Sequence, residues 1–243
     1  MCEYKVIVDN PIFKKPKHPN QKIFRYMDYY KFEDLLKTSE LYFSRIDKQN
    51  DNHEGKILVE PPFSEVEFFR TPYEGLSKNT YISCWRMDYN LNNNIWDEYC
   101  NNSDSIAIES TYKKLCDSII ICERDIIIGI VEYEYDENKL KEEMNYIYMF
   151  KLPEYKWEAE LRAVIPLQSY LYSSKDGKIN PGEVPDDYMR VLINLDTLIY
   201  RVHISPKATL AFANKVKTLI DRCPNLEVFF RLVGKNPISF GIN

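Results

Sequence analysis

The sequence predicts an α+β fold, with a mixed, mainly antiparallel sheet and flanking helices. Short stretches with strand-like alternation are interleaved with helix-like spacings, without the strict alternation of strand and helix that marks a parallel sheet. The 243 residues hold only seven glycines, of which the closest pair, Gly177 and Gly182, is five apart, and no GxGxxG or GxxxxGK(S/T) phosphate loop is present. No internal repeat or long linker interrupts the pattern. We therefore expect an extended N-terminal arm over residues 1–22 and a single α+β domain over residues 23–243.

Alternating apolar residues predict the strands, and helical spacing behind a capping side chain predicts the helices. Asp28 is expected to cap a helix that ends near Thr38, and Ser110 a helix that ends near Ile119. Ser205, followed by a proline, is expected to start a helix that ends near Cys223. Two further helices are expected over residues 90–99 and 136–149. The expected strands cover residues 22–26, 41–44, 81–85, 105–109, 126–135, 157–165, 190–193 and 199–204.

Composition excludes several classes of protein. The formal net charge of −5 disfavours broad, non-specific binding to nucleic acid, although a local basic patch stays possible. The six cysteines form no CxxC pair, so zinc-ribbon and redox-motif spacings are absent. The N-terminus lacks the apolar core of a secretion signal, and the most apolar stretch, residues 118–131, is too short and too charged to span a bilayer. We expect a cytoplasmic protein with reduced thiols and no membrane partner.

The segment Trp157–Ile165 carries the strongest candidate site. If it is a strand, Glu158, Glu160 and Arg162 lie on one face, because successive side chains alternate. Two carboxylates beside a guanidinium can bind a polar ligand, stabilise a cationic sugar, or act as a base. The alternative is a solvated edge strand that carries a ladder of charges.

Two earlier strands offer further candidates. Arg25 lies among aromatic residues, next to Tyr26, and is expected either to fork onto a phosphate or carboxylate, or to stack on a tyrosine. Ser83 is a small hydroxyl on an apolar strand, without the GxSxG context of a hydrolase nucleophile. Its neighbour Cys84 is expected to be a buried structural thiol, and Trp85 offers a ring for stacking.

The polar turn Asn50–Gly55 does not match the spacing of a calcium loop. His53 in this turn is a weak metal ligand on its own, and His18 and His203 have no partner nearby in the sequence. We expect no resident metal.

Taken in order, the motifs resemble a known family. The segment IFRYMDYYKFEDLLKTSELYFSRIDKQNDNHEG is followed by YISCW, IWDEYC, SIAIEST, WEAELRAV and VHISPKA. This order is similar to that of the bacterial domain-of-unknown-function family 2971, from about Ile23 to about Val216. One difference lies in the turn, where the family has Asn-Asp-Pro and this chain has Asn50-Asp51-Asn52.

The early strand arginine, central strand serine and later Glu-x-Glu strand also resemble the Arg–Ser–Glu layout of ADP-ribosyltransferases. This resemblance implies that Arg25 holds the pyrophosphate of NAD and that Ser83 helps to organise the pocket for the nicotinamide ribose. It implies that Glu160 hydrogen-bonds the ribose and stabilises the oxocarbenium-like transition state.

By the same resemblance, Glu158 positions or deprotonates the acceptor, and Tyr26 or Trp85 stacks on the nicotinamide. The expected function is an NAD-dependent ADP-ribosyltransferase-like protein, a toxin or phage-defence effector, with NAD as substrate and a protein or nucleic acid as acceptor. One alternative is a non-enzymatic ligand- or protein-binding module of a defence or regulatory system, which suits the 19 tyrosines. Another is a metal-dependent nuclease that uses Asp51, Glu54, Glu158 and Glu160.

Overall fold

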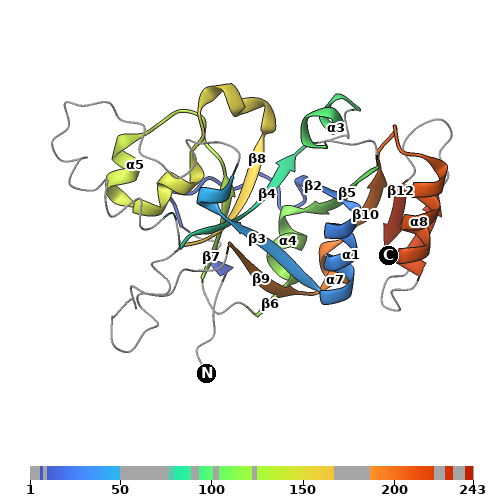
Figure 1. Ribbon diagram of the computed structural model, residues 1–243. Helices are drawn as coiled ribbons and strands as arrows, with labels where there is room; N and C mark the ends of the chain where they lie inside the picture. The colour runs from blue at the N-terminus through green and yellow to red at the C-terminus, as the bar shows by residue number, and fades with distance from the viewer. Residues whose placement is uncertain are drawn as a thin grey trace. The chain divides into compact units, whose positions relative to one another are not determined.

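The computed structural model contains helices and a mainly antiparallel set of strands, as the sequence predicts (Figure 1). It describes residues 6–7, 10–49, 77, 79–88, 93–100, 104–121, 125–166, 187–221, 228–231 and 239–242. The chain divides into two compact units. Unit 1 comprises Met1–Lys15, Tyr42–Cys84 and Ile121–Val191, and unit 2 comprises Pro16–Leu41, Trp85–Ile120 and Leu192–Asn243. The expected division into an arm and one domain stays a prediction.

Unit 1 is built on the strand order β1-β7-β8-β4. β1 is parallel to β7, whereas β7 and β8 are antiparallel, as are β3 and β4. Residues in or entering this unit form the strands β1 Val6–Ile7, β3 Glu40–Arg45, β4 Tyr81–Met87, β6 Ile119–Ile121, β7 Ile126–Ile130, β8 Glu160–Ile165 and β9 Tyr188–Ile193. Its helical segments are η1 Ile46–Lys48, α5 Glu137–Glu142, η2 Met144–Met149 and η3 Pro153–Glu158.

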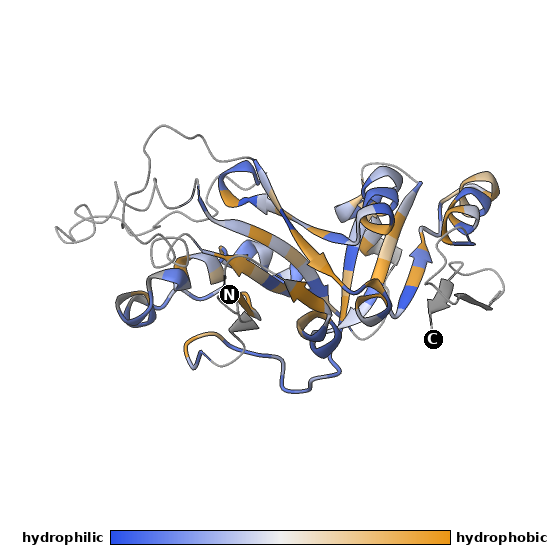
Figure 2. Cartoon of the chain, turned by 90° about the horizontal axis from the view of Figure 1, so that it is seen from below, coloured by the Kyte–Doolittle hydropathy of each residue, from blue (hydrophilic) through white to orange (hydrophobic). Residues whose placement is uncertain are grey.

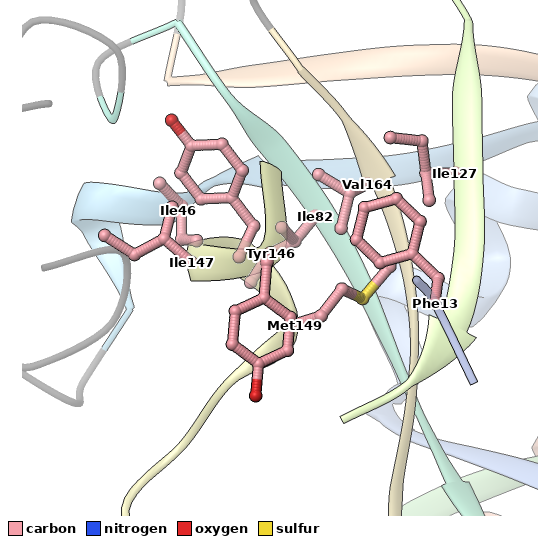
Figure 3. Packing of buried hydrophobic residues seen from close by; sticks show 9 residues of the cluster. Phe13, Ile46, Ile82, Ile127, Tyr146, Ile147, Met149 and Val164 are labelled. Carbon is pink, nitrogen blue, oxygen red and sulfur yellow. The ribbon is translucent and has the colours of Figure 1, made fainter. Parts of the chain in front are cut away.

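The core of unit 1 gathers side chains that are far apart in the sequence. Phe13, which lies in the segment expected to be an arm, is buried against the side chains of β7, β8 and η2. Figure 3 shows the Met149 side chain extending toward the Phe13 ring. Gly129 on β7 leaves the space for this packing, since a Cβ there would lie 3.3 Å from the Lys14 carbonyl oxygen. The remaining members of the cluster are Ile46, Ile82, Ile127, Tyr146, Ile147, Tyr148 and Val164.

Unit 2 contains the antiparallel pairs β4–β2, β2–β5, β5–β10, β10–β12 and β12–β11. Strands and helices of the chain both carry blue, hydrophilic residues and orange, hydrophobic residues (Figure 2). The additional strands are β2 Lys22–Asp28, β5 Ser105–Thr111, β10 Arg201–Ile204, β11 Val228–Arg231 and β12 Ser239–Ile242. The helices are α1 Tyr29–Thr38, α3 Asn93–Tyr99, α4 Tyr112–Ser118, α7 Leu195–Leu198 and α8 Leu210–Asp221.

The helix that was expected after Asp28 is confirmed. The Asp28 carboxylate accepts a hydrogen bond from the Lys31 backbone nitrogen at 2.9 Å, and α1 ends at Thr38. Ser39 closes it in the left-handed region, with φ 55°. The helix buries Phe32, Leu35 and Leu36, the apolar face that the spacing predicts.

Two helix caps are wrong in the sequence prediction. β5 continues through Thr111, which pairs with Lys22 of β2, so Thr111 rather than Ser110 caps α4. The Ser110 hydroxyl instead donates to the Leu198 carbonyl oxygen. At α8 the Thr209 hydroxyl accepts from the Phe212 backbone nitrogen at 3.2 Å, whereas Ser205 belongs to a preceding turn. Both helices begin later in the chain than the sequence predicts. The predicted caps belong to the structure before the helix, Ser110 to β5 and Ser205 to a turn.

Three element boundaries also differ. The strand expected over residues 126–135 ends at Ile130, and the helix expected over residues 136–149 is α5 followed by the 3-10 helix η2. The strand expected over residues 157–165 begins only at Glu160, because Pro153 starts the 3-10 helix η3 and Ala159 ends it in the left-handed region, with φ 44°. Residues 90–92 of the expected helix lie outside the described part of the chain. None of the helices described is long and apolar enough to cross a bilayer.

Candidate functional site

The candidate site of unit 1 is centred on Glu160, the first residue of β8. Every residue of β8 is buried, because β8 lies between β7 and β4 in the strand order. Glu160 is 3% exposed and Arg162 is fully buried. The expectation of a solvated edge strand is therefore wrong, and the charged residues of this strand lie inside the unit.

Glu160 and Arg162 are two residues apart on β8 and share one face, as the alternation predicts. Arg162 Nε donates to Glu160 Oε1 at 2.7 Å, and Arg162 Nη2 donates to Glu160 Oε2 at 3.0 Å. Arg162 Nη1 donates to the Tyr148 carbonyl oxygen at 2.8 Å. The guanidinium thus binds the carboxylate through two parallel hydrogen bonds and is anchored to η2 by a third.

Lys151 brings a second cation to the carboxylate. Its Nζ lies 3.3 Å from Glu160 Oε2 and 2.6 Å from Glu158 Oε2. The sequence predicts Glu158 and Glu160 on the same strand, and this is wrong. Glu158 is the last residue of the 3-10 helix η3, which precedes β8. Lys151 therefore links two carboxylates that come from different elements.

The charges around Glu160 keep it ionised. Burial alone would raise its pKa, but Arg162 and Lys151 outweigh that effect, and a hydrogen bond from the Cys84 thiol adds to theirs. The pKa of Glu160 is lowered to about 2. The backbone nitrogen of Glu160 also donates to the Tyr133 hydroxyl at 3.0 Å, and burial raises the pKa of that hydroxyl to about 12. At neutral pH the site holds a carboxylate anion beside a neutral phenol.

Cys84, and not Ser83, reaches Glu160 from β4. The Cys84 thiol hydrogen-bonds the Glu160 carboxylate. Consecutive residues of a strand point to opposite faces, so the Ser83 side chain points away from this carboxylate. Its hydroxyl is buried and has no hydrogen-bond partner among the described residues. The structure of unit 1 does not bring Ser83 and Glu160 together.

The other residues expected to bind NAD lie in unit 2. Arg25 Cζ lies 5.8 Å from the centre of the Trp85 ring, whereas Tyr26, the next residue of β2, contacts other rings. The Tyr26 ring is stacked on Tyr99 with centroids 5.0 Å apart, and meets Trp96 edge-on at 5.0 Å. Arg25 and Tyr26 therefore have different neighbours, and their role in NAD binding stays a prediction, as does that of Trp85.

Sequence reasoning missed Lys151, Tyr133 and the role of Cys84. Lys151 follows the apolar segment 146–150, and that position was the available signal in the sequence. Its burial is seen only in the structure. It also missed a pair in unit 2, because His203 lies 2.7 Å from Glu109, a residue 94 positions earlier. No local pattern links residues that far apart.

The turn Asn50–Gly55, including His53, lies outside the described residues, as do Asp51 and Glu54 of the nuclease hypothesis. Within the described residues, no three His, Cys, Asp or Glu side chains are grouped so that they could hold a metal ion.

Comparison with protein-family models, curated proteins and solved structures finds no match to this chain. The resemblances to the bacterial family and to ADP-ribosyltransferases stay predictions, and the arrangement of residues in each unit carries the functional argument.

Proposed function

We propose that the chain is an NAD-dependent ADP-ribosyltransferase-like enzyme in which Glu160 supplies the negative charge that faces the ribose. The observation that carries the proposal is the pairing of Glu160 with Arg162, which fixes an ionised carboxylate on a buried strand. Cleavage of the bond between ribose and nicotinamide develops positive charge on the sugar. A carboxylate that is already oriented, in surroundings with little water, stabilises such charge without reorganisation.

A ribose hydroxyl can reach this carboxylate by displacing one weak donor. A carboxylate has about four acceptor positions. Arg162 takes two of them and Lys151 a third, and among the described residues the Cys84 thiol is the remaining neighbour. A thiol is a weak hydrogen-bond donor, so exchange for a sugar hydroxyl is favourable. Cys84 thus marks the side from which the sugar approaches.

Glu158 is the proposed partner for the acceptor. It is less buried than Glu160 and ends η3, next to the exposed Trp157. The bond between ribose C1′ and the nicotinamide nitrogen breaks, and its electron pair leaves with nicotinamide. The acceptor nucleophile then bonds to C1′ and gives its proton to Glu158. For this step, Glu158 must give up its contact with Lys151 and contact the acceptor instead. The proposed acceptor is a protein or nucleic acid, the target of a toxin or phage-defence effector.

The test combines nicotinamide release with modification of an acceptor. The purified chain is incubated with NAD and candidate proteins and nucleic acids, and nicotinamide and ADP-ribosylated products are measured. Glu160→Gln keeps the size of the side chain and removes its charge, and Glu154→Gln makes the same change at an exposed position of η3. We expect turnover in the wild type and in Glu154→Gln, and loss of turnover in Glu160→Gln. Turnover in all three, or in none, contradicts the proposal.

A second candidate, a non-enzymatic binding module, is favoured by the balance of charge at Glu160. Lys151 and Arg162 together neutralise Glu158 and Glu160, so the cluster has the composition of an internal structural ion-pair network. For a binding module, Glu160→Gln lowers stability but leaves partner binding unchanged below the unfolding temperature. A pull-down from the source cell with wild type and Glu160→Gln, together with the NAD assay, separates the two functions.

A further inference from the structure

A second polar cluster lies in unit 2, on one face of β2, β5 and β10. These three strands are neighbours in the sheet (Figure 1). At its centre is Glu109 of β5, which is 2% exposed. Its cross-strand partners are Phe24 on β2 and Arg201 on β10, and directly paired residues of antiparallel strands share a face. Lys22 and His203, two residues from these partners, reach the same carboxylate diagonally.

The distances define how Glu109 is held. His203 Nε2 lies 2.7 Å from Glu109 Oε2, and Lys22 Nζ lies 2.9 Å from Glu109 Oε1. Arg201 Nη1 lies 3.8 Å from Oε2, which is an ion pair but is too long for a hydrogen bond. Arg201 is therefore the least tightly engaged of the three, and its guanidinium also lies 5.2 Å from the Tyr200 ring centre.

The protonation states follow from the surroundings. Burial would raise the pKa of Glu109, but the hydrogen bonds from His203 and Lys22 outweigh it and lower that pKa. Burial lowers the pKa of His203 against the opposing effect of Glu109. At neutral pH we assign an ionised Glu109 and a neutral His203 whose Nε2–H donates to it. One anion then faces two cations, and the cluster carries one excess positive charge.

That excess charge faces outward. The side chains of Lys22 and Arg201 are 41% and 39% exposed, whereas Glu109 and His203 beneath them are buried. A further cation, Arg86 on β4, lies opposite Phe24 but is paired with Asp88 at 3.3 Å. A buried carboxylate thus holds a partly exposed ammonium near one oxygen and a partly exposed guanidinium near the other, and both groups can bind the oxygens of a phosphate group.

We propose that Lys22 and Arg201 bind the phosphate group of a phosphorylated small molecule, and that Glu109 and His203 position these two side chains. Replacing a buried ion pair by apolar residues is often neutral or stabilising, so packing alone does not require a carboxylate and an imidazole in these strands. The proposal concerns unit 2 and does not rest on the ADP-ribosyltransferase activity.

Isothermal titration calorimetry of the full chain at constant ionic strength tests this site. The probes are inorganic phosphate, pyrophosphate and adenosine monophosphate. The variants are Lys22→Gln and Arg201→Gln, with Lys113→Gln on α4 as a control that removes one exposed charge elsewhere in the unit. We expect the wild type to bind at least one probe, and each site variant to bind it at least about tenfold more weakly, as expected for a lost hydrogen bond between charged groups. Lys113→Gln binds like the wild type, and Lys22→Arg retains most of the affinity.

Tighter binding of adenosine monophosphate than of inorganic phosphate supports the proposal and identifies a nucleotide ligand. Equal binding supports it with the phosphate group as the whole of the recognised chemistry. Failure of the wild type to bind any of the three probes overturns the proposal. So does an equal loss of affinity in Lys113→Gln and the two site variants, which would indicate attraction by overall charge. Thermal unfolding of each variant confirms that it is folded at the temperature of the titration.

Discussion

Glu160 and Arg162, two residues apart on β8, form a buried ion pair with two parallel hydrogen bonds of 2.7 and 3.0 Å. Removal of either side chain leaves the charge of the other buried without this partner in unit 1. We expect Arg162→Gln to lower the free energy of unfolding by about 3–5 kcal/mol, the usual cost of removing one partner of a buried pair. Denaturant unfolding measures this loss, with Lys156→Gln as a control on the exposed side of η3. A loss below that of the control would contradict the structural role of the pair.

The lowered pKa of Glu160 predicts a particular acid sensitivity. A carboxyl group whose pKa falls on folding, here from 4.5 to about 2, stabilises the folded state above the higher value. This stability is lost as the pH falls through that window. The difference in unfolding free energy between wild type and Glu160→Gln should therefore be constant near neutral pH and shrink between about pH 5 and pH 2. A difference that does not change over this range would contradict the assignment.

Cys116 on α4 should react slowly with thiol reagents. Burial raises its pKa to about 11, so only about one thiol in a thousand is ionised at pH 8. Alkylation with iodoacetamide, followed by peptide mass mapping, should label Cys116 in the folded chain far more slowly than in the denatured chain. Equal rates in the two states would show that the thiol is neither buried nor perturbed.

The cap of α4 can be tested by exchanging its hydroxyl for other groups. Thr111→Ala should cost about 1 kcal/mol, and Thr111→Asp should restore the cap because a carboxylate accepts the same backbone hydrogen bond. Ser110→Asp should destabilise more than Thr111→Asp, since Ser110 is fully buried and its hydroxyl donates to a carbonyl oxygen. Stability measurements that reverse this order would restore Ser110 as the cap.

Gly129 should not tolerate a side chain. An added Cβ would lie 3.3 Å from both the Lys14 carbonyl oxygen and the Phe13 Cβ. Gly129→Ala should lower the free energy of unfolding by about 1–3 kcal/mol, the usual range for overpacking. Denaturant unfolding measures this loss. A Gly129→Ala variant as stable as the wild type would contradict the close packing of β7 against residues 13 and 14.

Local chemistry explains which parts of the fold the sequence predicts. Asp28 caps α1 through a backbone group three residues away, and the apolar spacing of that helix is also local. No local pattern predicts the left-handed conformation of Ala159, because alanine rarely adopts it. This residue separates Glu158 in η3 from Glu160 in β8.

The candidate site was predicted only where partners are close in sequence. The alternation of β8 correctly places Glu160 and Arg162 on one face, but it does not indicate Lys151. The resemblance to ADP-ribosyltransferases predicts Ser83 in the site, whereas its neighbour Cys84 reaches the carboxylate. In unit 2, the Glu109–His203 pair depends on the register of β5 against β10, which is set by the packing of the whole sheet.

The proposed activity depends most directly on the charge of Glu160. Steady-state release of nicotinamide, measured over a range of NAD concentrations, should give a kcat for Glu160→Gln that is lower by about 100-fold or more, with KM changed only a few-fold, as for a group that acts mainly in the transition state. Glu154→Gln should match the wild type in both constants. A folded wild-type chain that releases no nicotinamide, or a Glu160→Gln variant with an unchanged kcat, would contradict the account.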